Sequence, residues 1–360
     1  MVSTNFDHLK NAIKTEVNNL GFSHIGYCSP KTPIGFDTYL QWLDQGHSAD
    51  LEYLQRNDAI EKRRDPRKIL ESVETIIVLA IPYYPPNPPE AGLSNPRIAS
   101  YALGEDYHKV IPVLLKSFIQ WLESNINGEH LEYKVYTDTG PILERSLATM
   151  AGIGWIGKNS CLIIPGQGSY FLLAEILINL YFSPDQQLDI DYCGNCHRCI
   201  DSCPTKCIQD NRTIDTANCI SYLTIENKKE ISENLREKTG NWVFGCDVCQ
   251  QVCPWNKQFA KLPKHTYFQP FDQISSFRFE QINALDESLF NQIVTNSPIK
   301  RAKLKGFKRN TVNAIGNSGN PDFLSIMENL LGTETDLMLI NQIQWSIRRI
   351  IEQNSNKVSN

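Results

Sequence analysis

Apolar and polar positions in the first half of the chain follow two different periods. Residues 5–20 place apolar side chains three and four positions apart, which predicts an amphipathic helix. Residues 75–82 are instead an unbroken apolar run rich in β-branched residues, typical of a strand buried on both faces. The same criteria predict further strands at 23–28, 132–137, 160–164 and 169–179, and helices at 107–125 and 141–151. We therefore expect an α/β or α+β domain whose sheet is covered by helices.

The pattern changes twice further along the chain. A cysteine-rich segment, 191–256, leaves room only for short helices between its cysteines. Beyond it, helical periodicity is expected at 298–316, 321–331 and 336–353, with short breaks rich in Gly and Asn, which suggests a small HEAT-like module. These changes divide the chain into three expected domains, 1–185, 186–260 and 261–360.

Composition is compatible with this division. The chain has 360 residues, of which 41% are hydrophobic, so two or three domains with real cores are expected. No apolar run reaches the length of a membrane span, and no membrane partner is expected. Eleven cysteines without an export signal indicate a reducing compartment in which thiolates are kept for metal rather than for disulfides. We expect a cytoplasmic monomer.

The most specific chemical signal is the spacing of the cysteines. One group matches the C-x2-C-x2-C-x3-C-P run of bacterial two-cluster ferredoxins: Cys193, Cys196, Cys199 and Cys203, followed by Pro204. A second copy is incomplete, because it has Cys246, Cys249 and Cys253 before Pro254 but Val243 where its first cysteine would stand. Cys219 lies between the copies and is the obvious replacement. The chain is therefore expected to carry electrons.

In such ferredoxins the cysteine before the proline binds the other cluster. The spacing therefore predicts two [4Fe–4S] clusters with crossed ligand sets. Pairs of the C-x2-C type also build zinc sites, but zinc does not explain two separate Cys-Pro endings. The first set is Cys193, Cys196, Cys199 and Cys253; the second is Cys203, Cys219, Cys246 and Cys249.

Charge is unevenly distributed along the chain. The net charge of −5 argues against a uniformly basic nucleic-acid binder, but six of the ten residues at 300–309 are basic. Such a run is either a solvated helix face or a local phosphate-binding patch. The six are Lys300, Arg301, Lys303, Lys305, Lys308 and Arg309.

The first domain contains three segments that could act on a substrate. Asp138 follows a predicted strand, where catalytic groups often lie, although composition alone favours a turn or helix N-cap. Residues 151–160 are rich in glycine around Trp155 and Lys158, which lets the backbone approach a bulky ligand. Residues 101–109 group two tyrosines with His108, and a lone histidine is more often structural than a ligand.

These segments together resemble the epoxyqueuosine reductases. The resemblance extends from about residue 58 to residue 317 and rests on long motifs. They are Asp138-x-x-Pro141-x-Leu143-Glu144-Arg145, Ala151-Gly152-x-Gly154-Trp155-x-Gly157-Lys158, Tyr101-Ala-x-Gly-x-Asp-Tyr-His108-Lys109, Cys219-Ile-Ser-Tyr-Leu-Thr-Ile-Glu226, Cys253-Pro-Trp-Asn256 and Ser297-Pro-x-Lys300-Arg301.

The resemblance implies an enzyme that reduces epoxyqueuosine at the wobble position of a tRNA anticodon to queuosine, with loss of water. It implies a nitroreductase-like domain holding cobalamin, a ferredoxin-like domain with two [4Fe–4S] clusters and a helical module. Asp138 matches the proton donor and is expected to be kept protonated by burial. The basic run would contact tRNA phosphates. Residues expected at the cobalamin are Arg63, Tyr101, Asp138, Gly154, Trp155, Lys158, Asn159, Ser221 and Tyr222.

Some features depart from the family pattern or remain open. Thr139 and Gly140 stand where small residues such as Ser-Ala are commoner, and Cys207, Cys28 and Cys161 are interpreted as spare core thiols. A low-potential electron donor is needed and is not identified by the sequence. The alternatives are a cytoplasmic cobalamin-dependent reductive dehalogenase, disfavoured by the basic helical tail and the missing export signal, and a ferredoxin-type electron carrier without a substrate.

Overall fold

The core of the first part of the chain is a four-stranded antiparallel sheet. The computed structural model describes residues 5–85, 95–188 and 191–358. The strands lie in the order β1 (His24–Cys28), β2 (Thr75–Pro82), β7 (Phe171–Ile178) and β4 (Tyr133–Tyr136). β2 and β7 pair along their whole length, with Thr75 opposite Ile178 and Pro82 opposite Phe171. All four strands lie where the sequence predicts strands, so the expected mixed fold is confirmed.

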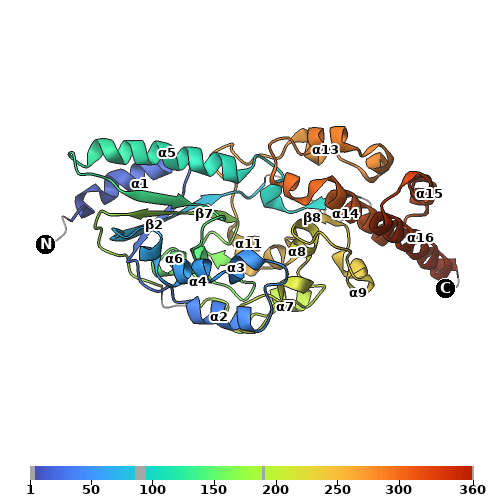
Figure 1. Cartoon of the computed structure of the whole chain (residues 1–360), viewed down its shortest axis with the longest axis horizontal. Coiled ribbons are helices and arrows are strands. Elements are labelled where there is room, and N and C mark those ends of the chain that lie inside the picture. The colour runs from blue at the N-terminus through green and yellow to red at the C-terminus, as the bar shows by residue number, and fades with distance from the viewer. Residues whose placement is uncertain (1–4, 86–94, 189–190, 359–360) are drawn as a thin grey trace.

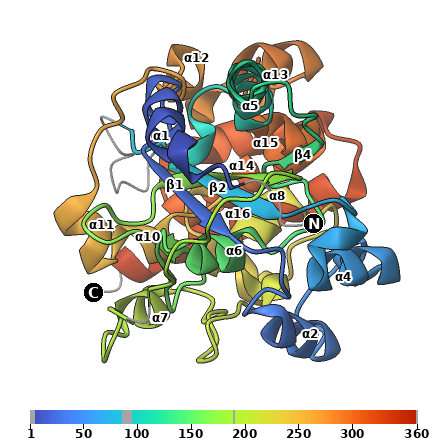
Figure 2. The ribbon, with the colours of Figure 1, turned by 90° about the vertical axis from the view of Figure 1, so that its left-hand side faces the viewer.

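Helices cover both faces of this sheet. α1 (Lys10–Asn19) and α5 (Tyr107–Asn125) lie on one face, and α6 (Glu144–Met150) lies on the other (Figures 1 and 2). Side chains of β7 alternate between two apolar clusters, so that Ala174 and Ile176 pack with α1 and α5 while Leu173 and Leu177 pack with α6. The helices α2 (Phe36–Asp44), α3 (Glu52–Gln55) and α4 (Asn57–Arg64) were not anticipated from the sequence.

Two small two-stranded sheets accompany the main one, and one of them connects two regions of the chain. β5 (Trp155–Ile156) pairs with β6 (Leu162–Ile163), and β3 (Arg97–Ile98) pairs in parallel with β8 (Trp242–Phe244). The second pairing joins residues of the first expected domain to the cysteine-rich region. Phe268, from the third expected domain, packs in the core of the first. Contacts therefore cross both expected domain boundaries, and the three-domain division stays a prediction.

The rest of the chain is helical, and its C-terminal part forms the end of the molecule opposite the N-terminus (Figure 1). The cysteine-rich region has five short α-helices, and the C-terminal part has five more. They are α7 (Arg198–Ser202), α8 (Ile220–Ile225), α9 (Glu233–Arg236), α10 (Val248–Gln251), α11 (Pro254–Phe259), α12 (Asp272–Ser275), α13 (Glu287–Ile293), α14 (Lys303–Ser318), α15 (Leu324–Thr333) and α16 (Leu337–Val358). Single 3-10 turns span Asp7–Leu9, Pro66–Lys68, Ser100–Ala102, Thr216–Asn218, Glu237–Thr239, Phe279–Ala284, Pro298–Ala302 and Pro321–Phe323. Among the described residues, no helix combines the length and apolar character needed to cross a membrane.

Buried polar side chains of α14 attach the C-terminal helices to the cysteine-rich region. Asn310 Nδ2 donates to the carbonyls of Thr224 and Val243, both at 2.8 Å. Arg309 is 1% exposed and donates to the carbonyls of Leu223 at 2.6 Å and Asn227 at 2.9 Å. The expectation that Arg309 contacts tRNA is therefore wrong, because its guanidinium is held inside the protein.

We predict that Asn310→Ala destabilises the protein without touching any cofactor. Each carbonyl left without a donor costs about 1–3 kcal/mol, so the thermal unfolding midpoint should fall by several degrees. Differential scanning fluorimetry would measure it, with Asn329→Ala on the exposed surface of α15 as the matched control. Equal midpoints for the two variants would show that α14 is not anchored by these bonds.

Candidate active site

A large hollow lies where the three regions meet. It consists of two adjoining cavities of about 660 and 1110 Å³. The smaller one is lined by the start of α5, by Phe171 and Leu172 of β7, and by residues near Pro298. The larger one extends toward α2, α4 and the segment 211–216. Both are lined by Tyr53, Asp138, Thr139, Ser221, Tyr222 and Arg301.

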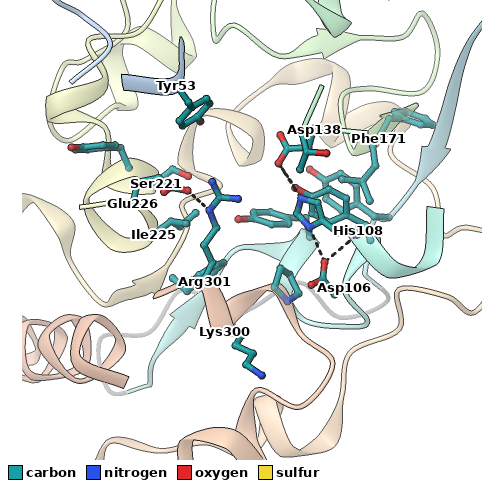
Figure 3. Close-up of a pocket in the computed structure, with 18 residues that line it drawn as sticks. Tyr53, Asp106, His108, Asp138, Phe171, Ser221, Ile225, Glu226, Lys300 and Arg301 are labelled. Atoms are coloured by element: carbon teal, nitrogen blue, oxygen red, sulfur yellow. Dashed lines mark hydrogen bonds and ion pairs between the residues drawn. The ribbon is translucent and has the colours of Figure 1, made fainter. Parts of the chain in front are cut away.

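Asp138 projects into this hollow from the loop after β4 (Figure 3). Its backbone has φ of 59°, a conformation that residues other than glycine rarely adopt and that is found at strained functional sites. The helix N-cap interpretation of Asp138 is wrong, because α6 begins at Glu144 and its cap position is Leu143. The Asp138 amide instead donates to Glu144 Oε1.

Two residues at the start of α5 hold the Asp138 carboxylate. Tyr107 donates its hydroxyl to Asp138 Oδ2 at 2.9 Å, and His108 Nε2 lies 3.2 Å from the same oxygen. The other ring nitrogen of His108 lies 2.8 Å from Asp106 Oδ1, which also caps α5 by accepting from the His108 amide. The imidazole is therefore fixed between two carboxylates, and His108 has a role that the sequence did not assign to it.

These contacts place the proton on His108 rather than on Asp138 in the free protein. Burial works to lower the pKa of His108, but the two carboxylates outweigh it and raise that pKa to about 9. Burial works to raise the pKa of Asp138, but the hydrogen bonds from His108 and Tyr107 outweigh it and lower that pKa. The Asp138 side chain is 52% exposed. The expectation that burial keeps Asp138 protonated is therefore wrong for the free protein.

Arg301 faces Asp138 from the other side of the smaller cavity (Figure 3). Its guanidinium forms an ion pair with Glu226, which follows α8. Tyr53, 49% exposed, lies close to the same guanidinium, while Lys300 points away from the group. Arg301 is therefore part of the cavity wall, and its neighbour Lys300 is free to face solvent.

The residues expected at the cofactor fall into two groups. Arg63, Asp138, Ser221 and Tyr222 line the larger cavity, and Tyr101 lines the smaller one. The other four lie beside the cysteine loop and line neither cavity: Gly154, Trp155, Lys158 and Asn159.

Side-chain contacts explain the position of this second group. The Trp155 ring lies 5.0 Å from the rings of both Tyr192 and Trp255. Lys158 Nζ donates to the Gly194 carbonyl at 2.7 Å, between the first two cysteines of the motif. Their neighbours Ile156 and Ser160 do line the larger cavity. The glycine-rich segment therefore lies between the hollow and the cysteines.

The cysteines gather in two places that mix the two motifs. Cys253, from the second motif, packs with Cys193, from the first, against Trp155 and Ile163. Burial, together with the charges of Cys193 and Cys253, raises the pKa of Cys199 to about 11. The Cys196 amide donates to the Cys193 carbonyl at 2.9 Å within the same loop.

The second gathering contains Cys203, which ends the first motif, together with Cys219 and Cys249. Cys199 of the first motif also packs here, so it lies near both gatherings. Burial raises the pKa of Cys246, and Cys219 and Cys203 add to this increase, so Cys246 lies near them. Cys219 also lines the larger cavity. One group of cysteines therefore lies directly against the hollow that Asp138 faces.

Two of the thiols interpreted as spare are not isolated. Cys207 Sγ lies 3.5 Å from Cys203 Sγ, and Cys161 is a hydrogen-bonding neighbour of Cys249. Cys28 is buried in β1, among the apolar residues beneath α6. Only Cys28 fits the description of a core thiol remote from the motif cysteines.

Comparison with known proteins identifies the class of the cysteine-rich region. Residues 192–256 match the family model for a 4Fe-4S double cluster binding domain, which excludes the zinc alternative. Residues 63–139 match the model for Epoxyqueuosine reductase QueG, DUF1730. The chain is thus an iron–sulfur protein with two cluster sites beside a sheet domain.

Full-length relatives define the family more closely. The chain is 39% identical over 306 residues to the epoxyqueuosine reductase of Cyclobacterium marinum, covering 83% of this chain and 94% of that one. It is 35% identical over 350 residues to that of Aliivibrio fischeri, covering 96% and 92%. The chain belongs to the epoxyqueuosine reductase family, as the motifs predicted.

Solved structures share the fold. The epoxyqueuosine reductase of Streptococcus thermophilus superposes with a TM-score of 0.85 at 26% identity, covering 96% of this chain and 91% of that one. That of Bacillus subtilis, solved with its catalytic aspartate loop swung out of the active site, gives 0.84 at 26% identity, covering 95% and 90%. A further epoxyqueuosine reductase, solved with an epoxyqueuosine-modified tRNA-Tyr stem loop, gives 0.80 at 26% identity, covering 95% and 99%.

The contact between His108 and Asp138 predicts a specific pH dependence of stability. Because the folded-state pKa of His108 is about 9, above its ordinary value, the pair stabilises the fold fully below pH of about 6.5. That contribution should be lost as pH rises through about 9. The unfolding midpoint of the wild type, minus that of His108→Gln, should therefore shrink over this range.

Thermal scans of both proteins across the range would measure this difference. His130→Gln is the matched control, since the His130 side chain is 86% exposed and lies remote from Asp138. If the difference in unfolding midpoint between the wild type and His108→Gln stayed constant with pH, His108 would not carry the proton at the contact with Asp138.

Proposed function

We propose that this protein reduces epoxyqueuosine in the anticodon of tRNA to queuosine, with cobalamin bound in the hollow and electrons supplied through two [4Fe–4S] clusters. The observation that carries the proposal is the placement of Asp138 and Cys219 on the wall of one hollow. A ligand in this hollow would contact both the proton donor Asp138 and the cluster that Cys219 is proposed to hold. The relatives that share the whole chain are named for this reaction.

The proposed cluster ligands are the crossed sets expected from the sequence. Cys193, Cys196, Cys199 and Cys253 would hold the outer cluster, and the set containing Cys219 would hold the inner one. The grouping of Cys253 with Cys193 supports this arrangement, since neighbouring cysteines of one motif would otherwise stay together. Residues 1–185 would bind cobalamin, 186–260 the clusters and 261–360 the tRNA.

The size and the lining of the hollow support cobalamin as its ligand. The two adjoining cavities, of about 660 and 1110 Å³, give room for a large cofactor, and their walls carry tyrosine, serine and arginine side chains that can bind its polar groups. Arg63, Tyr101, Ser221 and Tyr222 would hold the cofactor, with Ile156 and Ser160 where Gly154, Trp155, Lys158 and Asn159 were expected. When bound, cobalamin would supply a strongly nucleophilic reduced cobalt, the part of the chemistry that side chains cannot provide.

The side chains around Asp138 would supply the acid. Opening an epoxide requires a proton on its oxygen. Filling the cavity would remove water from the exposed half of the Asp138 carboxylate and so favour its neutral form. His108 Nε2, which would pass on its proton, lies 3.2 Å from Asp138 Oδ2. Tyr107 would keep Asp138 Oδ2 oriented during this transfer.

Recognition of tRNA would use fewer basic residues than the sequence suggested. Lys305 pairs with Asp336 at 2.6 Å, and Lys308 pairs with Glu334 at 2.9 Å. Lys300 and Lys303 are exposed, and no ion pair is found for them among residues 5–85, 95–188 and 191–358. We therefore assign the phosphate contacts to Lys300 and Lys303, beside the cavity wall formed by Arg301. A tRNA substrate and reduced thiolates both fit a cytoplasmic monomer that receives electrons from a separate low-potential donor.

The proposal is tested by anaerobic assay with epoxyqueuosine-containing tRNA and a chemical reductant. Reconstituted protein should form queuosine only when cobalamin is added. Asp138→Asn keeps the size of the side chain but loses its transferable proton, so turnover should fall by roughly 100-fold or more. Cobalamin absorption and iron content should stay at wild-type levels. A wild-type protein that binds no corrinoid would instead be an electron carrier.

Binding of tRNA should depend on Lys300 and Lys303. Replacing both with Ala should weaken affinity and flatten the log–log salt dependence by about 0.7 to 0.9 per lost phosphate contact. Filter binding over a range of salt concentrations would measure both effects. Replacement of the exposed Lys14 and Lys116 removes the same charge from α1 and α5 and should change neither. Equal salt slopes for the two double variants would move the tRNA interface elsewhere.

A further inference from the structure

Glu175 is a carboxyl group in the middle of an apolar core. It lies at the centre of β7, opposite Val78 on β2 and Tyr136 on β4. Its side chain is 0% exposed, and among the described residues no N–H or hydroxyl donor reaches either oxygen; its hydrogen-bonding neighbour is another carboxyl group, that of Glu144. Its strand neighbours on the same face, Leu173 and Leu177, pack in the apolar cluster beneath α6. A lone ionised carboxylate is very unfavourable in such surroundings, so Glu175 is held neutral.

A second carboxyl group lies beside it. Glu144 begins α6, is half-buried, lines the larger cavity and accepts a hydrogen bond from the Asp138 amide. Burial, with the charge of Asp138, raises the pKa of Glu144 to about 7. Burial, with the charge of Glu144, raises that of Glu175 well above its ordinary value. Two adjacent buried carboxyl groups resist simultaneous ionisation, so this acid pair, Glu144 with Glu175, retains a proton at neutral pH.

The groups facing the acid pair do not neutralise it. Arg145, next to Glu144 on α6, supplies the positive charge that acts on Glu144. From the other elements come Cys28 on β1, Tyr107 on α5 and Asp138 on its loop. None of these three bears positive charge. The pair is therefore built to hold a proton beside the catalytic loop rather than to form an ion pair.

The proposed reaction needs one proton more than Asp138 can hold. Reducing the epoxide to an alkene breaks both C–O bonds, forms one C=C bond and releases the oxygen as water, which consumes two electrons and two protons. The first proton goes to the oxygen as the ring opens, and the second goes to the resulting hydroxyl as it leaves. The clusters account for the electrons, and the pair of Asp138 and His108 accounts for one proton.

We propose that the acid pair stores the second proton. Glu144 donates this proton to Asp138 at the wall of the larger cavity. The adjacent Glu175 keeps Glu144 able to bind a proton. Both Glu144 and Asp138 line that cavity, and Glu144 Oε1 accepts from the Asp138 amide, so the two carboxyl groups lie close to each other. After transfer, the neutral Glu175 carboxyl donates to the Glu144 carboxylate. Both are positioning residues that act through Asp138, and their assignment rests on the proposed function.

A spectroscopic test does not depend on turnover. Infrared spectra of the cobalamin-free protein, titrated across neutral pH, should contain a protonated carboxyl band that Glu175→Gln removes. Glu144→Gln should remove the component that titrates near neutral pH, while its amide oxygen still accepts from Asp138. Glu74→Gln, an exposed carboxylate just before β2, is the matched control and should leave both signals intact. A wild-type spectrum without a protonated carboxyl at neutral pH would overturn the proposal.

Kinetics would separate a proton store from a structural role. In Glu144→Gln the ring-opening step should proceed at close to the wild-type rate, because Asp138 and His108 begin with the one proton that this step needs. Loss of water from the opened ring needs the second proton and should be slow even in the first turnover. Steady-state kcat should therefore fall by about ten-fold or more, most severely above neutral pH, with KM for tRNA unchanged and Glu144→Asp restoring most of the rate. Equal slowing of ring opening and of water loss would overturn the proposal. A wild type inactive on epoxyqueuosine would refute the proposed function and leave the infrared result to decide the acid pair.

Discussion

The interleaving of two cysteine motifs is the constraint on which the rest of the structure depends. Cys253 closes the group that begins at Cys193, and Cys203 belongs to the group that contains Cys219 and Cys249. Each group takes cysteines from both motifs, and α7 packs against α10 where the two motifs meet. Cys219, in the second group, lines the larger cavity.

The wall that faces Asp138 in the smaller cavity is held in place by polar contacts of α14. Asn310 and Arg309 of α14 satisfy carbonyls of the segments around α8 and β8. Arg301, which precedes α14, is thereby held facing Asp138 across the smaller cavity. Burying these groups would be costly without partners, but the Asn310 amide and the Arg309 guanidinium both donate to backbone carbonyls of the neighbouring segments. The helical module therefore shapes the site as well as offering a basic surface.

Strand and helix positions could be predicted from the sequence where burial alone decides them. Residues 75–82 and 107–125 form β2 and α5 over the predicted ranges, because continuous or periodic apolar side chains have one favourable placement. The hydrogen-bond partners of polar side chains could not be predicted in the same way. Arg309 has the same charge as Lys300, yet Arg309 is buried and Lys300 is exposed. Arg309 is buried because its guanidinium donates to backbone carbonyls about 80 residues away in the chain.

The site was only partly predictable for the same reason. Asp138 was identified by its motif, but its charge state depends on His108, and a histidine after a helix cap shows no sequence sign of that contact. Glu175 is the one charged residue in an otherwise apolar strand, an anomaly visible in the sequence, whereas its neighbour Glu144 is revealed only by the fold. Trp155 and Lys158 belong to a conspicuous segment, yet they face the cysteine loop because β5 and β6 turn them away from the hollow.

The crossed assembly of the two clusters against one hollow is the central claim, and an iron anomalous-difference map of anaerobically grown crystals tests it most directly. The account predicts two iron peaks: one among Cys193, Cys196, Cys199 and Cys253, and one among Cys203, Cys219, Cys246 and Cys249. The second peak should lie at the wall of the larger cavity, next to Cys219. Peaks bound by uncrossed cysteines, or an inner cluster screened from the cavity, would contradict it.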